Sequence, residues 1–214
     1  TAYEISLGLV GSEMCIRDSK IPDYEPHKET SLGSKAKKLN REINDYIYDI
    51  LLEEDGNSLL YYPIGNYLDH SLEASLEMIS SDHTLLGLGD GGAHCATICD
   101  ASFTTHMLTF WGRDRTRGKK LDLPWIIKSY TRDNALAIGL EDRGLIKEGM
   151  KADINIIDFD NLTLYSPEIR YDLPAEGKRL IQRVDGYKYT IVSGKVTYKD
   201  GVSTGELPGR LIRS

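Results

Sequence analysis

The sequence has few cysteines and no long hydrophobic run. Three cysteines in 214 residues are too few for a disulfide-stapled secreted domain, so a reducing, cytoplasmic environment is expected. No apolar run approaches the roughly 18 residues that a membrane span requires, so no membrane partner is expected. Basic residues are also in the minority, with 26 Lys and Arg against 33 Asp and Glu and a net charge of −7. This balance argues against a general nucleic-acid-binding surface.

The remaining composition is that of a globular protein. The chain is 40% hydrophobic and 28% charged, with 20 Gly and 7 Pro, which excludes collagen, coiled coil and extended disorder. These properties are compatible with a small-molecule substrate, and they carry no indication of oligomeric state.

Residues 1–19 differ in character from the rest of the chain. They read TAYEISLGLVGSEMCIRDS, and this segment resembles a translated sequencing-library adaptor over its whole length. The alternatives are a short apolar N-terminal strand or a truncated signal peptide. A signal peptide needs a basic start and a continuous apolar stretch, and Glu4, Gly11 and Glu13 interrupt this one. We therefore expect residues 1–19 to be an adaptor artefact without structure. On that interpretation Lys20 is not a natural N-terminus, and the chain is a C-terminal fragment of a longer protein.

Helical and strand patterns alternate between residues 34 and 88. Apolar residues at helical spacing run from Ser34 to Leu51 and recur over residues 69–80. Residues 59–62 and 84–88 are short apolar segments, typical of strands buried on both faces. This alternation predicts parallel βαβ units covered by helices.

The second half of the chain changes from helical to strand periodicity. Residues 90–120 are expected to form a loop or short helices, and Pro124 opens a further helix. Thr131 is expected to cap the next helical turn, which ends at Gly139. Ile154, Ile156 and Ile157 indicate one strand, and residues 188–199 (KYTIVSGKVTYK) indicate a hairpin around Ser193-Gly194. The last stretch is thus predicted to be a small β region.

Asp90 is the first candidate for chemistry, in GLGDGGAH at residues 87–94. It directly follows a predicted strand, and the loops at the carboxyl ends of parallel strands converge on active sites. A carboxylate flanked by glycines can act as a general base or metal ligand there; alternatively, Asp90 caps a following helix. His94 lies in the same loop, either as a substrate contact or metal ligand, or as a hydrogen-bonded loop histidine.

Two other groups of side chains could carry chemistry. Cys95 and Cys99 would share a helix face, but a lone CxxxC is a weak metal signal without a second pair of ligands, so we interpret both as packed thiols. Arg113, Arg115 and Arg117 lie in a predicted loop. Their planar guanidinium groups could clamp a carboxylate, or the three could form a solvated surface run. The histidines form no HxH or HExxH pair, so no complete metal site is recognisable.

Two segments together resemble the amidohydrolase superfamily. They are GLGDGGAHCATICDASF at residues 87–103 and TRDNALAIGLEDRGLIKEGMKADINIIDFD at residues 131–160. The closer likeness is to the N-acyl-D-amino-acid deacylase (D-aminoacylase) branch, which the tail at residues 172–213 also resembles. The resemblance covers nearly all of residues 21–214.

The resemblance implies an α/β fold, a (β/α)₈ TIM barrel with a small β-sandwich. Residues 20–145 would be the C-terminal part of the barrel and residues 146–214 the C-terminal part of the sandwich. It also implies one or two zinc ions and hydrolysis of a linear amide. Asp90 matches the aspartate at the end of the last barrel strand, which accepts a proton from the metal-bound water, passes it to the leaving amine and can contact one metal. His94 and Arg113 are the candidate substrate contacts.

The chain departs from the family pattern in its metal ligands. The early His-x-His pair, the two later histidines and the bridging cysteine or carboxylate have no counterpart here, and Cys95 is not that cysteine. Gly89 stands where many relatives have serine. We therefore expect the fragment to be inactive alone, and the intact enzyme to hydrolyse N-acyl-D-amino acids. The alternatives are hydrolysis of a cyclic amide or related C–N substrate by the same scaffold, or a non-catalytic module if the chain is complete.

Overall fold

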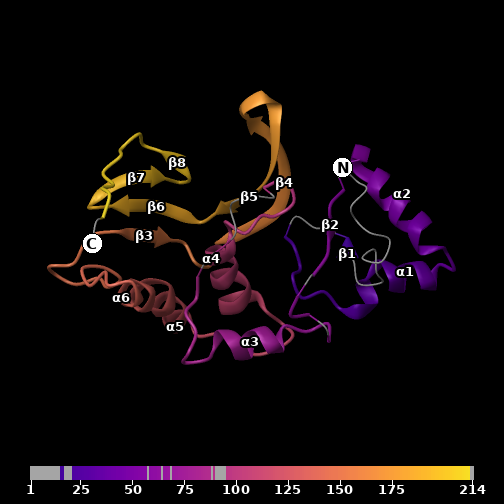
Figure 1. Ribbon diagram of the computed structural model, residues 1–214, viewed down its shortest axis with the longest axis horizontal. Coiled ribbons are helices and arrows are strands. Elements are labelled where there is room, and N and C mark those ends of the chain that lie inside the picture. Colours follow the sequence, from indigo (N-terminus) through magenta and orange to yellow (C-terminus); the bar gives the residue numbers. More distant parts are fainter. Residues whose placement is uncertain are drawn as a thin grey trace. The chain divides into compact units, whose positions relative to one another are not determined.

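The computed structural model describes residues 15–16, 21–56, 58–63, 65–67, 69–87, 89 and 95–212. It contains two compact units, Thr1–Ser81 (unit 1) and Asp82–Ser214 (unit 2). Helices and sheets occur together (Figure 1), so the mixed α/β character is confirmed. The predicted boundary between residues 145 and 146, the barrel and the sandwich stay predictions. None of the described helices is long and apolar enough to cross a membrane.

Unit 1 is mainly helical. Its elements are β1 (Cys15–Ile16), η1 (Lys28–Thr30), α1 (Leu32–Lys38), α2 (Ile43–Gly56), β2 (Leu60–Tyr61) and α3 (Glu73–Ile79). The Ser31 hydroxyl caps α1 by accepting the backbone N–H of Ser34 at 3.2 Å. The single helix predicted from Ser34 to Leu51 is two helices, because the chain turns through Asn40 with a φ of 50°.

The core of unit 1 is small and apolar. Leu32, Ile47 and Ile50 are buried together, and they are the inward-facing positions of α1 and α2. Glu25 is also buried, and its carboxylate accepts the backbone N–H of Leu72 at 2.8 Å. This bond ties the segment before η1 to the start of α3.

The strand pairings differ from the prediction. Every pairing in the described part of the chain is antiparallel. Residues 84–87 form no strand, so the predicted parallel strand at 84–88 is wrong over the residues that the structure describes. A buried parallel strand needs parallel neighbours for its backbone groups, and the described residues supply none. Strand β2 instead pairs with β1, which lies in the segment expected to be without structure; the rest of that segment lies outside the described residues.

Two helical segments form the α part of unit 2. The first runs through α4 (Phe103–His106) and the π-helical η2 (Met107–Asp114). The second runs through α5 (Leu123–Lys128), η3 (Ser129–Asp133) and α6 (Asn134–Ala137). Trp111 from the first and Ile126 from the second are buried. Arg115 is 1% exposed, with its guanidinium 4.7 Å from the Trp111 ring centroid. It is therefore part of the packed interior, not of a surface run of charges.

The sequence-based boundaries of these helices need two corrections. Residues 111–114 are helical and not a loop. Thr131 lies inside a continuous helix, where its hydroxyl donates to the Ile127 carbonyl oxygen at 2.6 Å, so it does not cap a new turn. The predicted end of the helix before Gly139 is confirmed, since α6 ends at Ala137.

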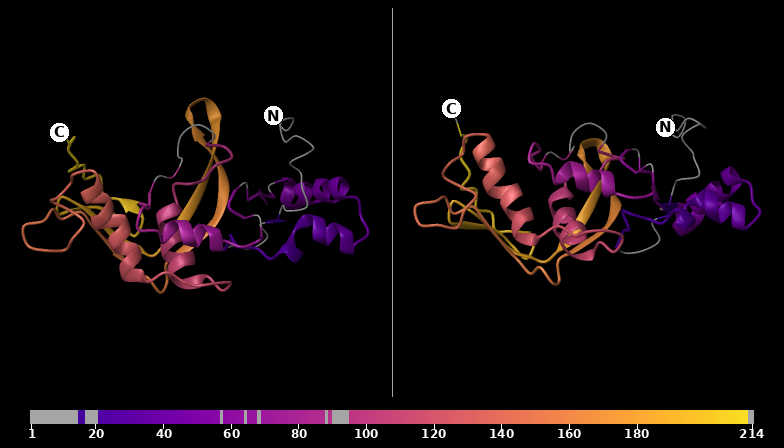
Figure 2. Two further views of the ribbon diagram at one scale, coloured as in Figure 1. Left: turned by 60° about the horizontal axis from the view of Figure 1, so that its bottom comes forward. Right: turned by 90° about the horizontal axis from the view of Figure 1, so that it is seen from below.

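The β part of unit 2 contains two sheets. Strands β3 (Ile154–Ile157), β6 (Tyr187–Val192), β7 (Lys195–Lys199) and β8 (Val202–Ser203) form a four-stranded sheet in the order β3-β6-β7-β8. The predicted strand at 154–157 and the hairpin around Ser193-Gly194 are both confirmed. Strands β4 (Thr163–Leu173) and β5 (Gly177–Asp185) form a separate long hairpin, visible as an extended ribbon (Figure 2).

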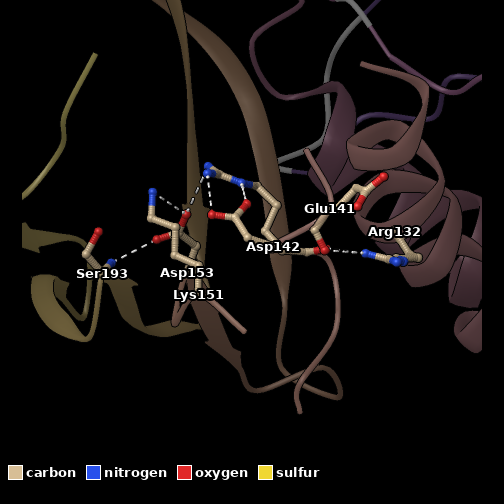
Figure 3. Close-up of polar contacts among 7 residues, drawn as sticks. Arg132, Glu141, Asp142, Lys151, Asp153 and Ser193 are labelled. Carbon is tan, nitrogen blue, oxygen red and sulfur yellow. Dashed lines mark hydrogen bonds and ion pairs between the residues drawn. The ribbon is translucent and has the colours of Figure 1, made fainter. Parts of the chain in front are cut away.

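A polar network joins the helical and β parts of unit 2 (Figure 3). The Arg132 guanidinium donates to the carbonyl oxygens of Glu141 and Arg143 at 3.1 and 3.0 Å. Arg143 is 3.5 Å from the Asp153 carboxylate, which also accepts the backbone N–H of Ser193 at 2.8 Å. The network thus connects η3, the loop that follows α6, the start of β3 and the β6–β7 turn. Residues of the 131–160 segment, which carries the family resemblance, therefore connect the helical part of unit 2 to its β part.

Candidate functional site

The segment that leads to Asp90 is held by two contacts. The side-chain amide of Asn134, in α6, donates to the Leu86 carbonyl oxygen at 2.5 Å. Gly89 lies so close to the next loop that a Cβ atom would be 2.6 Å from both the Asp100 carbonyl oxygen and the Phe103 ring. Only glycine permits this approach, so a serine at this position would displace the loop at 100–103.

Asp90 and His94 lie outside the described residues. Their roles as general acid/base and substrate contact therefore stay predictions. The structure describes the residue before Asp90 and resumes at Cys95, which begins a turn.

A pocket of about 300 Å³ opens where the described chain resumes. One wall is the segment from Cys95 to Thr105, and the other is strand β5. The apolar part of the lining comes from Ile98, Ala101, Leu180, Ile181 and Val184. The pocket and the Gly89 contact share the Asp100 loop, so the chain just before Asp90 lies beside the pocket wall.

Hydrogen bonds fix the two walls against each other. The Leu180 backbone N–H donates to the Cys95 carbonyl oxygen at 2.7 Å. The Ser102 hydroxyl donates to the Gln182 side-chain oxygen at 2.5 Å, and the Gln182 amide donates onward to the Tyr165 carbonyl oxygen at 2.8 Å. The polar side chains Ser102 and Gln182 therefore already have protein partners.

Two charged residues, Asp100 and Arg179, line the pocket, and Arg179 is held in an ion pair. Arg179 lines the pocket and donates two hydrogen bonds of 2.7 Å to the Asp172 carboxylate. This contact with Arg179 holds the pKa of Asp172 below its usual range, and the same contact raises the pKa of Arg179. The pair stays ionised at neutral pH and leaves the pocket without a net charge from this source.

The surroundings of Cys95 and Cys99 differ from those predicted from the sequence. Both are free thiols, Cys95 exposed and Cys99 partly buried, and both line the pocket. Residues 95–97 form a turn rather than a helix, so the prediction that the thiols pack on a shared helix face is wrong. The physical reason is that Cys95 lies close to β5. Its carbonyl oxygen accepts the backbone N–H of Leu180 in that strand.

Comparison with known proteins decides the family. The model of the Amidohydrolase family matches residues 56–198, which is more than half of the chain and includes both segments that carry the resemblance. The chain belongs to the amidohydrolase family. No curated protein and no solved structure matches it. The superfamily predicted from the sequence is confirmed, and the protein is a hydrolase of that superfamily.

Arg113 has structural partners in this amidohydrolase. Its guanidinium donates to the carbonyl oxygens of Phe159 and, at 2.7 Å, of Leu162, and it also pairs with Asp114 at 2.7 Å. The hydrogen bond to Asp114 is the main cause of a raised pKa for Arg113. These contacts join η2 to the segment between β3 and β4. A substrate contact by Arg113 stays a prediction.

The described residues do not fit a zinc site. Within residues 15–16, 21–56, 58–63, 65–67, 69–87, 89 and 95–212, no three His, Cys, Asp or Glu side chains gather in a way that could hold a metal ion. Asp90 and His94, the candidate donors predicted from the sequence, lie outside these ranges. We therefore assign no step of the reaction to a metal.

A serine motif near the end of the chain is structural. Residues Gly201 to Gly205 read Gly-Val-Ser-Thr-Gly, the spacing of a serine nucleophile on a strand-to-helix turn. Here Ser203 lies in the short strand β8, paired with β7, and its hydroxyl accepts the Gly205 backbone N–H at 3.3 Å. No helix follows it among the described residues, so the geometry of a nucleophile elbow is not met.

Proposed function

We propose that this amidohydrolase cleaves the amide bond of N-acyl-D-amino acids and that the chain is the C-terminal fragment of the enzyme. Family membership supports hydrolysis, and the likeness of residues 87–103, 131–160 and 172–213 to the D-aminoacylase branch supports the substrate class. The observation that carries the proposal is the Gly89 contact with Asp100 and Phe103. Asp90 follows Gly89 directly in the sequence, and Gly89 is packed against the loop at residues 100–103.

The proposed role of Asp90 is proton transfer. Its carboxylate accepts a proton from the attacking water as the new C–O bond forms, and it delivers that proton to the amide nitrogen as the C–N bond breaks. The products are a carboxylate and a free D-amino acid. Zinc, which the family resemblance implies, would need ligands from outside the described residues. The free thiols Cys95 and Cys99 fit the reducing cytoplasm proposed as its location.

The test is a kinetic comparison on the intact enzyme, with release of free amino acid as the readout. We expect turnover of N-acyl-D-amino acids well above that of the L-enantiomers, and no turnover by the 214-residue chain alone. Replacing Asp90 by Asn should lower kcat by about 10²- to 10⁴-fold. Asp82→Asn is the matched control, because Asp82 is an exposed carboxylate in the turn after α3, and it should leave kcat unchanged.

Other outcomes would contradict parts of this proposal. Hydrolysis of a cyclic amide in preference to both enantiomers would favour the alternative C–N substrate. An intact protein without activity on any amide would favour a non-catalytic module. Full activity of Asp90→Asn would remove Asp90 from the chemistry.

A further inference from the structure

Cys95 and Cys99 both line the pocket between the Cys95–Thr105 segment and β5. Neither is part of a disulfide, and three residues separate them in the sequence. The two differ in exposure, because Cys95 is exposed and Cys99 is partly buried. An accessible thiol beside a second, more protected thiol is the arrangement in which exchange at the first is resolved by the second.

Contacts of the backbone hold both cysteines against β5. The Cys95 carbonyl oxygen accepts the backbone N–H of Leu180 at 2.7 Å. The Cys99 carbonyl oxygen lies 3.4 Å from the Ser102 hydroxyl, which donates to a β5 side chain at 2.5 Å. Residues 95–97 form a turn between these two anchors. The fold therefore presents both side chains to one pocket.

Two charged side chains line the pocket with the thiols, Arg179 and Asp100. The pKa of Arg179 is raised mainly by its hydrogen bond to Asp172, and the negative charge of the Cys95 thiolate raises it further. The Cys95 sulfur thus lies within electrostatic reach of the guanidinium on β5. The Asp100 carboxylate disfavours an anionic reagent, so an uncharged reagent is the suitable probe of this pocket.

We propose that Cys95 and Cys99 are a reversible modification site for small-molecule disulfides. The Cys95 thiolate attacks one sulfur of the reagent, forms a mixed disulfide and displaces the other half as a thiolate. The Cys99 thiolate then attacks the Cys95 sulfur, so that the second half leaves and a Cys95–Cys99 disulfide remains. The protein thiols are oxidised, and the reagent is reduced to two thiols that take up the protons lost by the protein.

The site goes beyond the proposed hydrolysis and does not depend on it. In a reducing compartment such a disulfide is transient, as in redox-sensing proteins. Excess small-molecule thiol reverses both steps and restores the two cysteines.

The test follows the exchange by mass. The full 214-residue chain is used with Cys15→Ser, so that Cys95 and Cys99 are its remaining cysteines. The uncharged probe 2-hydroxyethyl disulfide is added without oxygen, and samples are quenched with acid for intact and peptide mass spectrometry. We expect a final product lighter than the reduced chain by two hydrogen atoms, after a short-lived mixed disulfide at Cys95. No reaction, or a mixed disulfide that persists, would overturn the proposal.

Comparison with the unfolded chain shows whether the pocket is responsible for closure. Two cysteines this close in sequence also meet in an unfolded chain, so closure by itself is not sufficient. We expect the mixed disulfide to close roughly tenfold or more faster in the folded chain than in urea, because the fold holds both side chains at one pocket. Circular dichroism verifies the two states, and equal closure rates would contradict the proposal.

Variants assign the role of each thiol. Cys99→Ser should leave the mixed disulfide at Cys95 as the final product. Cys95→Ser should slow the first reaction by roughly tenfold, because Cys99 is less accessible. An equally fast first reaction in Cys95→Ser would remove Cys95 from the role of attacking thiol.

Thr97→Cys in the Cys99→Ser chain is the matched control. Thr97 is exposed and is not among the described lining residues, although it is closer to Cys95 in sequence than Cys99 is. A thiol at this position should not resolve the mixed disulfide. Closure as fast as with Cys99 would show that the pocket does not select the resolving thiol, and the proposal would fall.

Discussion

At the scale of single residues, His106 lies in surroundings that change its pKa. Its ring lies flat against Phe110, with centroids 4.9 Å apart and an interplanar angle of 9°. Burial lowers the pKa of His106 to about 4, from 6.5. Between these two pH values the unfolded chain binds a proton that the folded chain does not. The free energy of unfolding contributed by this site therefore falls as pH drops from 6.5 toward 4.

His106→Phe should remove this pH dependence while keeping the ring contact with Phe110. The measurement is Tm between pH 5 and pH 7.5 for the parent and the variant. We expect the parent to lose more Tm than the variant as the pH is lowered through this window. Identical slopes would show that His106 is not buried in its neutral form.

Residue-level roles divide into those that sequence can predict and those that depend on distant partners. Asp90 stands out in the sequence because glycines surround it after an apolar segment. The substrate contact by Arg113 stays a prediction, whereas the carbonyl oxygens that its guanidinium contacts lie 46 and 49 residues away in the sequence. Nothing in the local sequence marks such partners, since a guanidinium can pair with any carbonyl that the fold brings within reach.

At the scale of elements, the loop after α6 depends on Gly144. This residue has a φ of +82°, and a Cβ would lie 2.7 Å from the Arg132 Cα. Gly149 is a matched control in the same loop, because it has a φ of +85° and no atom within 4 Å of its Cβ position. The two sites share the backbone strain and differ in the clash.

Gly149→Ala should cost about 1 kcal/mol of unfolding free energy from the left-handed backbone alone. Gly144→Ala should cost roughly 1–3 kcal/mol more, because the added methyl group overpacks the contact with η3. Urea unfolding of both variants measures the difference. Equal losses would mean that the approach of Gly144 to Arg132 is not maintained in solution.

The predicted and missed elements differ in the strength of their local signals. The β6–β7 hairpin has alternating apolar residues and a Ser-Gly turn with positive φ at both positions, so its pattern was sufficient. The helical segment from Phe103 to Asp114 falls in the region predicted as a loop or short helices, and its length was not predicted, because Thr104, Thr105 and Thr109 are weak helix formers. Tertiary packing, such as the burial of Trp111, outweighs that propensity. The β4–β5 hairpin has Pro167 within a strand, a residue that local pattern places outside strands.

At the scale of the whole molecule, the motif-bearing segments predicted the family correctly, and the match over residues 56–198 confirms it. The pairing of strands was not predictable in the same way. Apolar runs at residues 59–62 and 84–88 indicate buried strands, but a strand forms only where neighbouring backbone is available to pair with it. In the described residues β2 has an antiparallel partner and residues 84–87 have no strand partner, so the pattern alone could not determine the sheet.

The most direct test of the account is the DNA that precedes the Ile21 codon in the genome that encodes this chain. The account predicts that the reading frame continues upstream without the adaptor-like segment and encodes a His-x-His pair after an apolar strand, together with the remaining metal-binding histidines. Those residues would complete the site to which Asp90 is proposed to belong. A start codon near Lys20 would contradict the account, because Asp90 would then have no partners for amide hydrolysis.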